Sequence, residues 1–277
     1  DSLIDCSIGP GGPSGPRPGH RERRQPPVDW RAGFGLVVGL ALVVGGVGRG
    51  LSAWAARPAY SVVYTLGRGG EPDPDLLVAS TAALERSAQW SGASARVHGN
   101  LALLQLERAR RAYKQPEVSL PLIESGVAAQ REALAEAPAR GSGWARLVYA
   151  QDLKTQAIEA QALWAVVPAD MPDARVAQAE GLLALEMAFL TRDLSFSLVR
   201  FRLDAALARW EQLRPWLRNA ARAEVLELTR FGARGMDALV ELYLGSPQHW
   251  VIDEELAVDP AQRAYFEKRL ARRSHAG

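Results

Sequence analysis

A long apolar segment near the N-terminus constrains the fold of this chain more than any other feature. The stretch Ala32–Gly48 contains no charged or strongly polar residue, and the apolar character resumes after the single Arg49. Trp30 and Trp54 bracket the segment at about 36 Å in a helix that rises roughly 1.5 Å per residue, close to the distance between the two interfaces of a bilayer. The sequence therefore predicts a transmembrane helix over residues 30–56.

The arginines around this segment predict its orientation. Five precede it and three lie at its end or soon after it, and they are Arg17, Arg21, Arg23, Arg24 and Arg31, then Arg49, Arg57 and Arg68. This bias favours a cytoplasmic N-terminus. In a bacterium, the helix would then lie in the inner membrane and the chain after about residue 57 in the periplasm. Residues 1–29 have too few apolar side chains to fold, so we expect a disordered basic tail there.

Two other interpretations of the apolar segment remain open. Ala53 and Ala55 in "SAWA" have the spacing that a signal peptidase prefers, so the segment also fits a cleaved signal peptide that would release a soluble periplasmic enzyme or carrier. A buried helix of a soluble protein would need a core around a rod that is apolar on all sides. The retained anchor is favoured, because the apolar stretch exceeds a usual signal core and the preceding region is long.

Glycines recur within the segment at a spacing that suits helix pairing. Gly35 and Gly39 form one G-x-x-x-G, and Gly46 and Gly50 form another. Small residues on one face let helices approach closely in lipid. We therefore expect pairing with a second copy, giving a homo-oligomer, or with another membrane protein.

The rest of the chain predicts an all-α fold. After residue 70 alanine, leucine, arginine and glutamate dominate, and apolar residues recur at helical spacing between glycine and proline breaks. Residues 57–75 hold "RPAYSVVY", a piece of extended character, and are predicted to be a linker. Residues 76–245 form the helical domain, and residues 246–277 a C-terminal helix with a basic tail.

Part of this helical region resembles the tetratricopeptide repeat family, which stacks helical hairpins into a solenoid. The match covers about 50 of the 277 residues. The residues that carry it, which the resemblance assigns to the repeat core, are Ala133, Pro138, Trp144, Leu147, Ala160, Trp164 and Pro172. Val148 and Gln151 depart from the pattern, as do Pro116 and Pro121 in the unit before. The resemblance implies a solenoid that binds other proteins in its groove.

The overall layout is similar to a loose group of single-pass envelope proteins of Gram-negative bacteria. They share a basic N-terminus, one span and a long C-terminal helical part with segments like "RFRLDAALARW". Some are associated with surface-polysaccharide or envelope assembly, which is the role that the similarity implies.

An arginine-rich stretch, "LVRFRLDAALARWEQLRPWLR", interleaves arginines with aromatic residues. One interpretation is an amphipathic helix whose arginines face water while its aromatics pack. The other is a concave surface that binds an acidic peptide or an anionic glycan through bidentate hydrogen bonds and stacking. The candidate partner-binding residues are Arg200, Arg202, Arg209 and Trp210.

Motifs for catalysis are absent from the sequence. The four histidines form no H-E-x-x-H pair, and the glycine signatures of hydrolases, phosphate loops and dinucleotide folds are missing. The single cysteine, Cys6, allows no disulfide framework and no thiolate metal site. His249 with three carboxylates in "QHWVIDEE" suits a cation, although capping of a helix start is the favoured interpretation. We expect no enzyme, no cofactor and no metal.

The charge distribution excludes a nucleic-acid partner. The formal net charge is +2, and six arginines lie within residues 1–56, so the long helical region is close to neutral. A nucleic-acid binder should carry a basic stripe on its folded part. The sequence therefore predicts a non-enzymatic scaffold, anchored in a bilayer, that binds one or more protein partners. The alternative is an accessory subunit of a membrane complex, held through its glycine-bearing helix.

Overall fold

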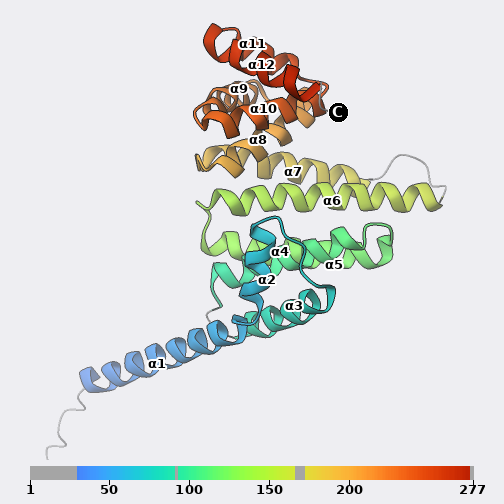
Figure 1. Cartoon of the computed structure of the whole chain (residues 1–277). Helices are drawn as coiled ribbons and strands as arrows, with labels where there is room; N and C mark the ends of the chain where they lie inside the picture. Colours follow the sequence, from blue (N-terminus) through green and yellow to red (C-terminus); the bar gives the residue numbers. More distant parts are fainter. Residues whose placement is uncertain (1–29, 91–92, 166–171, 275–277) are drawn as a thin grey trace, which may run out of the picture. The chain divides into compact units, whose positions relative to one another are not determined.

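The protein is all-α, as predicted, throughout the ranges 30–90, 93–165 and 172–274 that the computed structural model describes, and these ranges contain no strand (Figure 1). The chain divides into two units, Asp1–Leu42 and Val43–Gly277, with the boundary inside the first helix. The elements are α1 (Trp30–Ala56), α2 (Ala59–Gly67), α3 (Pro74–Ala88), α4 (Ala95–Arg111), α5 (Pro116–Glu136), α6 (Gly141–Ala165), α7 (Pro172–Leu190), α8 (Phe196–Ala208), the 3-10 turn η1 (Trp210–Gln212), α9 (Pro215–Thr229), α10 (Gly232–Gly245), α11 (Trp250–Leu256) and α12 (Pro260–Ser274).

Prolines mark the starts of five helices. Pro74, Pro116 and Pro215 occupy the first turns of α3, α5 and α9, and Pro172 and Pro260 begin α7 and α12. The fixed φ of proline suits this position, and the N–H that it lacks would have no partner within the helix. The prolines that break the pattern in the sequence therefore set where the helices begin.

Helices of the second unit pack mainly on their neighbours in the chain. α4 contacts α5, α5 contacts α6 and α6 contacts α7, followed by α8 with α9 and α9 with α10 (Figure 1). One large apolar core extends from α4 to α12, and a smaller core joins the end of α1 with α2, α3 and α4. Gly126 shows how close two helices come, because a Cβ added there would lie 3.1 Å from the Leu106 side chain.

The helical hairpin assigned by resemblance to the region after Trp144 does not form. Trp144, Leu147, Ala160 and Trp164 all lie on α6, a single helix of 25 residues. A repeat unit would need a turn between the first pair and the second pair, but no glycine or proline interrupts the chain there, so the helix continues. The hairpins of this protein therefore have other boundaries, and α6 continues without a break to Ala165.

The predicted linker is also corrected. Residues 59–67 form α2, where a piece of extended character was expected. The apolar residues Tyr60, Val63 and Leu66 recur at helical spacing and pack against the smaller core, and Val62 is buried in it. The two adjacent valines favour a strand locally, but burial on a helical face outweighs that preference. The disordered tail predicted for residues 1–29 lies outside the described residues.

Helix α1 coincides with the span predicted over residues 30–56. Its segment Phe34–Ala56 is long and apolar enough to cross a membrane, a test that a signal sequence also passes. The large side chains from Phe34 to Val47 are exposed. At the other end, the buried hydroxyls of Ser52 and Ser87 hydrogen-bond at 2.9 Å, and Ser87 Oγ also donates to the carbonyl of Ser52 at 2.7 Å. These bonds tie the C-terminal end of α1 to α3.

Candidate binding groove

The arginine face predicted on residues 200–210 is wrong for its central member. Arg202 on α8 is only 1% exposed. Its Nε and Nη2 donate to Glu224 Oε1 on α9, and its Nη1 donates to the carbonyls of Ala188 and Asp193 at 3.4 and 2.8 Å. Burial raises the pKa of Glu224 to about 7, although the positive charge of Arg202 acts in the opposite direction and lowers it. The guanidinium therefore joins three segments inside the core, where burial keeps it out of reach of a partner protein.

The other three candidates are also engaged within the protein. Trp210 is 4% exposed and belongs to the large core. Arg209 is half-buried and forms an ion pair with Asp152 on α6. Arg200 is exposed but pairs with Glu241 at 2.9 Å. These residues therefore form no common surface, because α8 ends at Ala208 and does not run on as the long helix that the sequence suggested.

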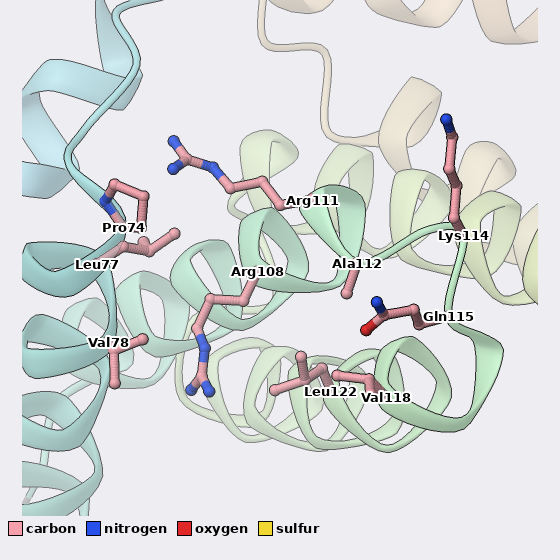
Figure 2. A pocket seen from close by; sticks show the side chains of 10 residues that line it. All are labelled: Pro74, Leu77, Val78, Arg108, Arg111, Ala112, Lys114, Gln115, Val118 and Leu122. Carbon is pink, nitrogen blue, oxygen red and sulfur yellow. The ribbon is translucent and has the colours of Figure 1, made fainter.

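A groove between α3, α4 and α5 has a volume of about 420 Å³ (Figure 2). Pro74, Leu77 and Val78 on α3 form one wall. The opposite wall comes from the end of α4 and the start of α5, and it is lined by Arg108, Arg111, Ala112, Lys114, Gln115, Val118 and Leu122. We call this hollow the α3–α5 groove.

The cations of the α3–α5 groove are incompletely neutralised. Glu107 accepts hydrogen bonds from both Arg110 and Arg111 at 2.8 Å, so one carboxylate serves two guanidinium groups. Burial alone would raise the pKa of Glu107, but these bonds hold it below its usual value. Arg108 and Lys114 have no ion pair among the described residues, and Nη2 of Arg111 is buried without an acceptor. The wall therefore carries uncompensated positive charge.

The same groove exposes apolar side chains. Val78 and Val118, on opposite walls, are 50% and 44% exposed. Leu77 on α3 is buried, and Leu122 is half-buried against the large core. Figure 2 shows the guanidinium groups of Arg108 and Arg111 extending from α4 toward α3. The groove thus combines apolar side chains on both walls with cationic side chains on one of them, which suits a ligand that has both apolar and acidic groups.

Comparison with known proteins provides no family for this chain. No family model, curated protein or solved structure matches it. The function must therefore be argued from the groove and from α1.

The glycines predicted to pack in the membrane have open surroundings. A Cβ added to Gly35, Gly39, Gly46 or Gly50 would meet no atom within 4 Å. These four positions of α1 therefore have no close neighbour among the described residues. Pairing of this face with a second copy or with another membrane protein stays a prediction.

The spacing of Pro138 and Trp144 has a local cause. The indole N–H of Trp144 donates to the carbonyl of Pro138 at 2.7 Å, so the tryptophan closes the turn between α5 and α6. Ala133 and Leu147 are buried nearby. Among the other residues assigned to a repeat core, Ala160 is half-buried and Pro172 is exposed at the start of α7, while the side chain of Trp164 lies outside the described residues.

The carboxylates near His249 are committed to other contacts. Glu254 and Glu255 lie within α11 and accept from Arg222 at 2.8 and 2.9 Å, and Asp253 Oδ2 accepts from Tyr243 at 3.2 Å. The described residues contain no group of three His, Cys, Asp or Glu side chains placed to hold a metal ion. These acids therefore act as ion-pair and hydrogen-bond partners between helices.

Sequence reasoning missed the α3–α5 groove for a clear reason. Arg108 and Arg111 resemble basic residues that complement the dipole at the end of a helix, which is a common structural role. One signal was available, since the two residues are three apart and so lie on one face of α4. The apolar wall, however, comes from α3, about thirty residues earlier in the chain, and only packing brings it opposite the arginines.

Proposed function

We propose that this protein is a non-enzymatic adaptor, anchored by α1 in a bacterial inner membrane, whose helical unit binds a protein partner at the α3–α5 groove. With a cytoplasmic N-terminus, the helical unit lies in the periplasm, where a role in surface-polysaccharide or envelope assembly is consistent with the layout of the chain. The proposal keeps the idea of a helical scaffold but no longer depends on a tetratricopeptide unit.

The observation that carries the proposal is the pairing of uncompensated cations with exposed apolar side chains in one hollow. Arg131 pairs with Glu180 at 2.8 Å, whereas Arg108 and Lys114, like Arg86 and Arg272, form no ion pair among the described residues. What distinguishes Arg108 and Lys114 is that both line a hollow that also exposes Val78 and Val118. A surface that leaves both charge and apolar area unsatisfied is typical of a binding site.

The anchor has its own support. The large apolar side chains of α1 between Phe34 and Val47 are exposed. Their exposure to water would be costly, at about 25 cal/mol for each Å² of apolar surface, and a bilayer removes that cost. The segment is therefore assigned to the hydrocarbon core.

Fractionation and gentle detergent extraction of the native, tagged protein test the proposal. We expect the full-length chain in the membrane fraction, and it should co-purify with specific companion proteins. Arg108→Glu should reduce this recovery, while Arg272→Glu, an exposed arginine on α12, should not. A shortened chain in the soluble fraction would contradict the anchor. Recovery that Arg108→Glu leaves intact would contradict binding at the groove.

A second candidate function is that of an accessory subunit in an integral membrane complex. It is favoured by the open surroundings of Gly35 and Gly39 on α1. Isoleucine at both positions would block close approach of a neighbouring helix. Loss of companions in this double variant, with no effect of Arg108→Glu, would identify the subunit. The opposite pattern would identify the adaptor.

A further inference from the structure

We infer that the α3–α5 groove binds an acidic amphipathic segment of its partner, with an apolar side chain against Val78 and Val118 and carboxylates on the cations of the other wall, Arg108, Arg111 and Lys114. The inference rests on the proposed adaptor function and goes beyond it by naming the chemistry of the partner. It predicts a short motif that contains both kinds of side chain, rather than a purely charged or a purely apolar one.

The positions of the cations determine the spacing of the acids in such a segment. Arg108 and Arg111 are separated by three residues on α4, so their Cβ atoms lie about 5–6 Å apart. Two carboxylates one helical turn apart match that separation. Arg111 shares Glu107 with Arg110, and its side chain is 27% exposed. A carboxylate from the partner can reach this exposed part of the guanidinium and form a charge-assisted hydrogen bond.

The size of the groove limits what enters it. Its volume of about 420 Å³ lies within the usual range for pockets that bind small molecules or a few side chains. Val78 and Val118 already offer apolar surface at its mouth. One or two large apolar side chains placed between them would bury that surface and would anchor the segment.

Charges at the rim favour a peptide over an anionic lipid or a nucleic acid. Glu71, Asp73 and Asp75 are exposed beside Pro74, the first residue of α3, which lines the groove. Asp73 also accepts from the N–H groups of Asp75 and Leu76 at 2.9 and 3.2 Å. The many phosphates of a lipid surface or a nucleic acid would contact these carboxylates as well as the arginines, and the carboxylates would repel them. A peptide presents only a few carboxylates and can direct them toward α4.

Selection from short random peptides displayed on phage tests the inference, with the full chain held in nanodiscs. The same library is selected in parallel on Arg108→Glu/Lys114→Glu. We expect the first selection to enrich peptides in which Asp or Glu residues three or four apart flank Leu, Ile, Phe or Trp. These peptides should be absent from the second selection, because reversal of two charges converts attraction into repulsion.

Binding of one labelled, enriched peptide then gives the magnitude. We expect affinity to fall about tenfold or more in Arg108→Glu, which corresponds to 1.4 kcal/mol, and to fall similarly in Val78→Asp. The matched controls are Arg272→Glu for charge and Leu183→Asp, an exposed leucine on α7, for apolar surface, and both should bind as the unchanged protein does. Circular dichroism of each variant verifies that it is folded.

Three results would overturn the inference. One is the absence of enrichment, and another is enrichment of basic peptides or of peptides that bind the charge-reversed protein equally well. The third is preferential binding of phosphatidylglycerol vesicles at the same residues. If one of these results is obtained while companion proteins are still recovered, the adaptor binds them at another surface. If companion proteins are also lost, the adaptor function itself is contradicted.

Discussion

Replacing Arg202 by methionine tests how much the buried ion pair contributes to the fold of the second unit. Arg202 and Glu224 have side chains that are 1% and 8% exposed, and the arginine also satisfies the carbonyls of Ala188 and Asp193. Removing one partner of such a pair typically costs about 3–5 kcal/mol, because a charge is left buried without compensation. We therefore expect the free energy of unfolding of Arg202→Met to be lower by about 3–5 kcal/mol above neutral pH.

The pH dependence makes this prediction specific. Burial raises the pKa of Glu224 from 4.5 to about 7 in the folded protein. A carboxyl whose pKa is raised on folding favours the folded state below its unfolded pKa, and that contribution is lost as the pH rises through the folded pKa. Without Arg202 the pKa of Glu224 rises further. The cost of Arg202→Met should therefore be smaller at about pH 6, where the carboxyl binds a proton, than at about pH 8.5.

The assay is urea unfolding of the full chain in detergent, followed by circular dichroism at several pH values. Arg200→Met is the control, since its pair with Glu241 is solvent-exposed and is worth less than about 1 kcal/mol. The double variant Arg202→Met/Glu224→Leu should regain most of the lost stability, because no charge remains buried. A cost no larger than that of Arg200→Met, or one independent of pH, would refute the reasoning.

Two further predictions concern close contacts between helices. Gly235→Ala should destabilise the protein by about 3 kcal/mol or more in thermal unfolding, because its Cβ would lie 1.8 Å from the carbonyl oxygen of Leu228. A Cβ added at Gly245 would meet no atom within 4 Å, so Gly245→Ala should not lower the stability. An equal loss of stability in both variants would contradict the close contact between Gly235 and Leu228. Ser87→Ala should cost about 1–3 kcal/mol, because Ser52 loses its buried partner. Faster amide exchange at the end of α1 would report this loss, and unchanged exchange would count against it.

The long apolar helix α1 and the helical class were predictable from the sequence because both depend on local properties. Length and apolarity define α1, and the structure starts and ends it at Trp30 and Ala56, as predicted. Helical periodicity likewise identified an all-α chain. Even so, α2 was missed, since Val62 and Val63 favour a strand until a core is present to bury one face of a helix.

The roles of the arginines depended on partners that no local pattern identifies. Arg202 lies in a stretch that looks solvent-facing, but Glu224 on another helix draws it into the core. Arg108 looks like an ordinary residue at a helix end, but α3 packs opposite it and makes it part of a groove.

The sequence by itself determined that this chain is helical and that one segment is apolar enough to span a bilayer. Each of these follows from the preferences of residues and their near neighbours. Only the tertiary structure decided that Arg202 pairs with Glu224, while Arg108 has no carboxylate partner among the described residues. The physical reason is that charge compensation acts over a few ångströms in space, and packing brings together residues that are far apart in the chain.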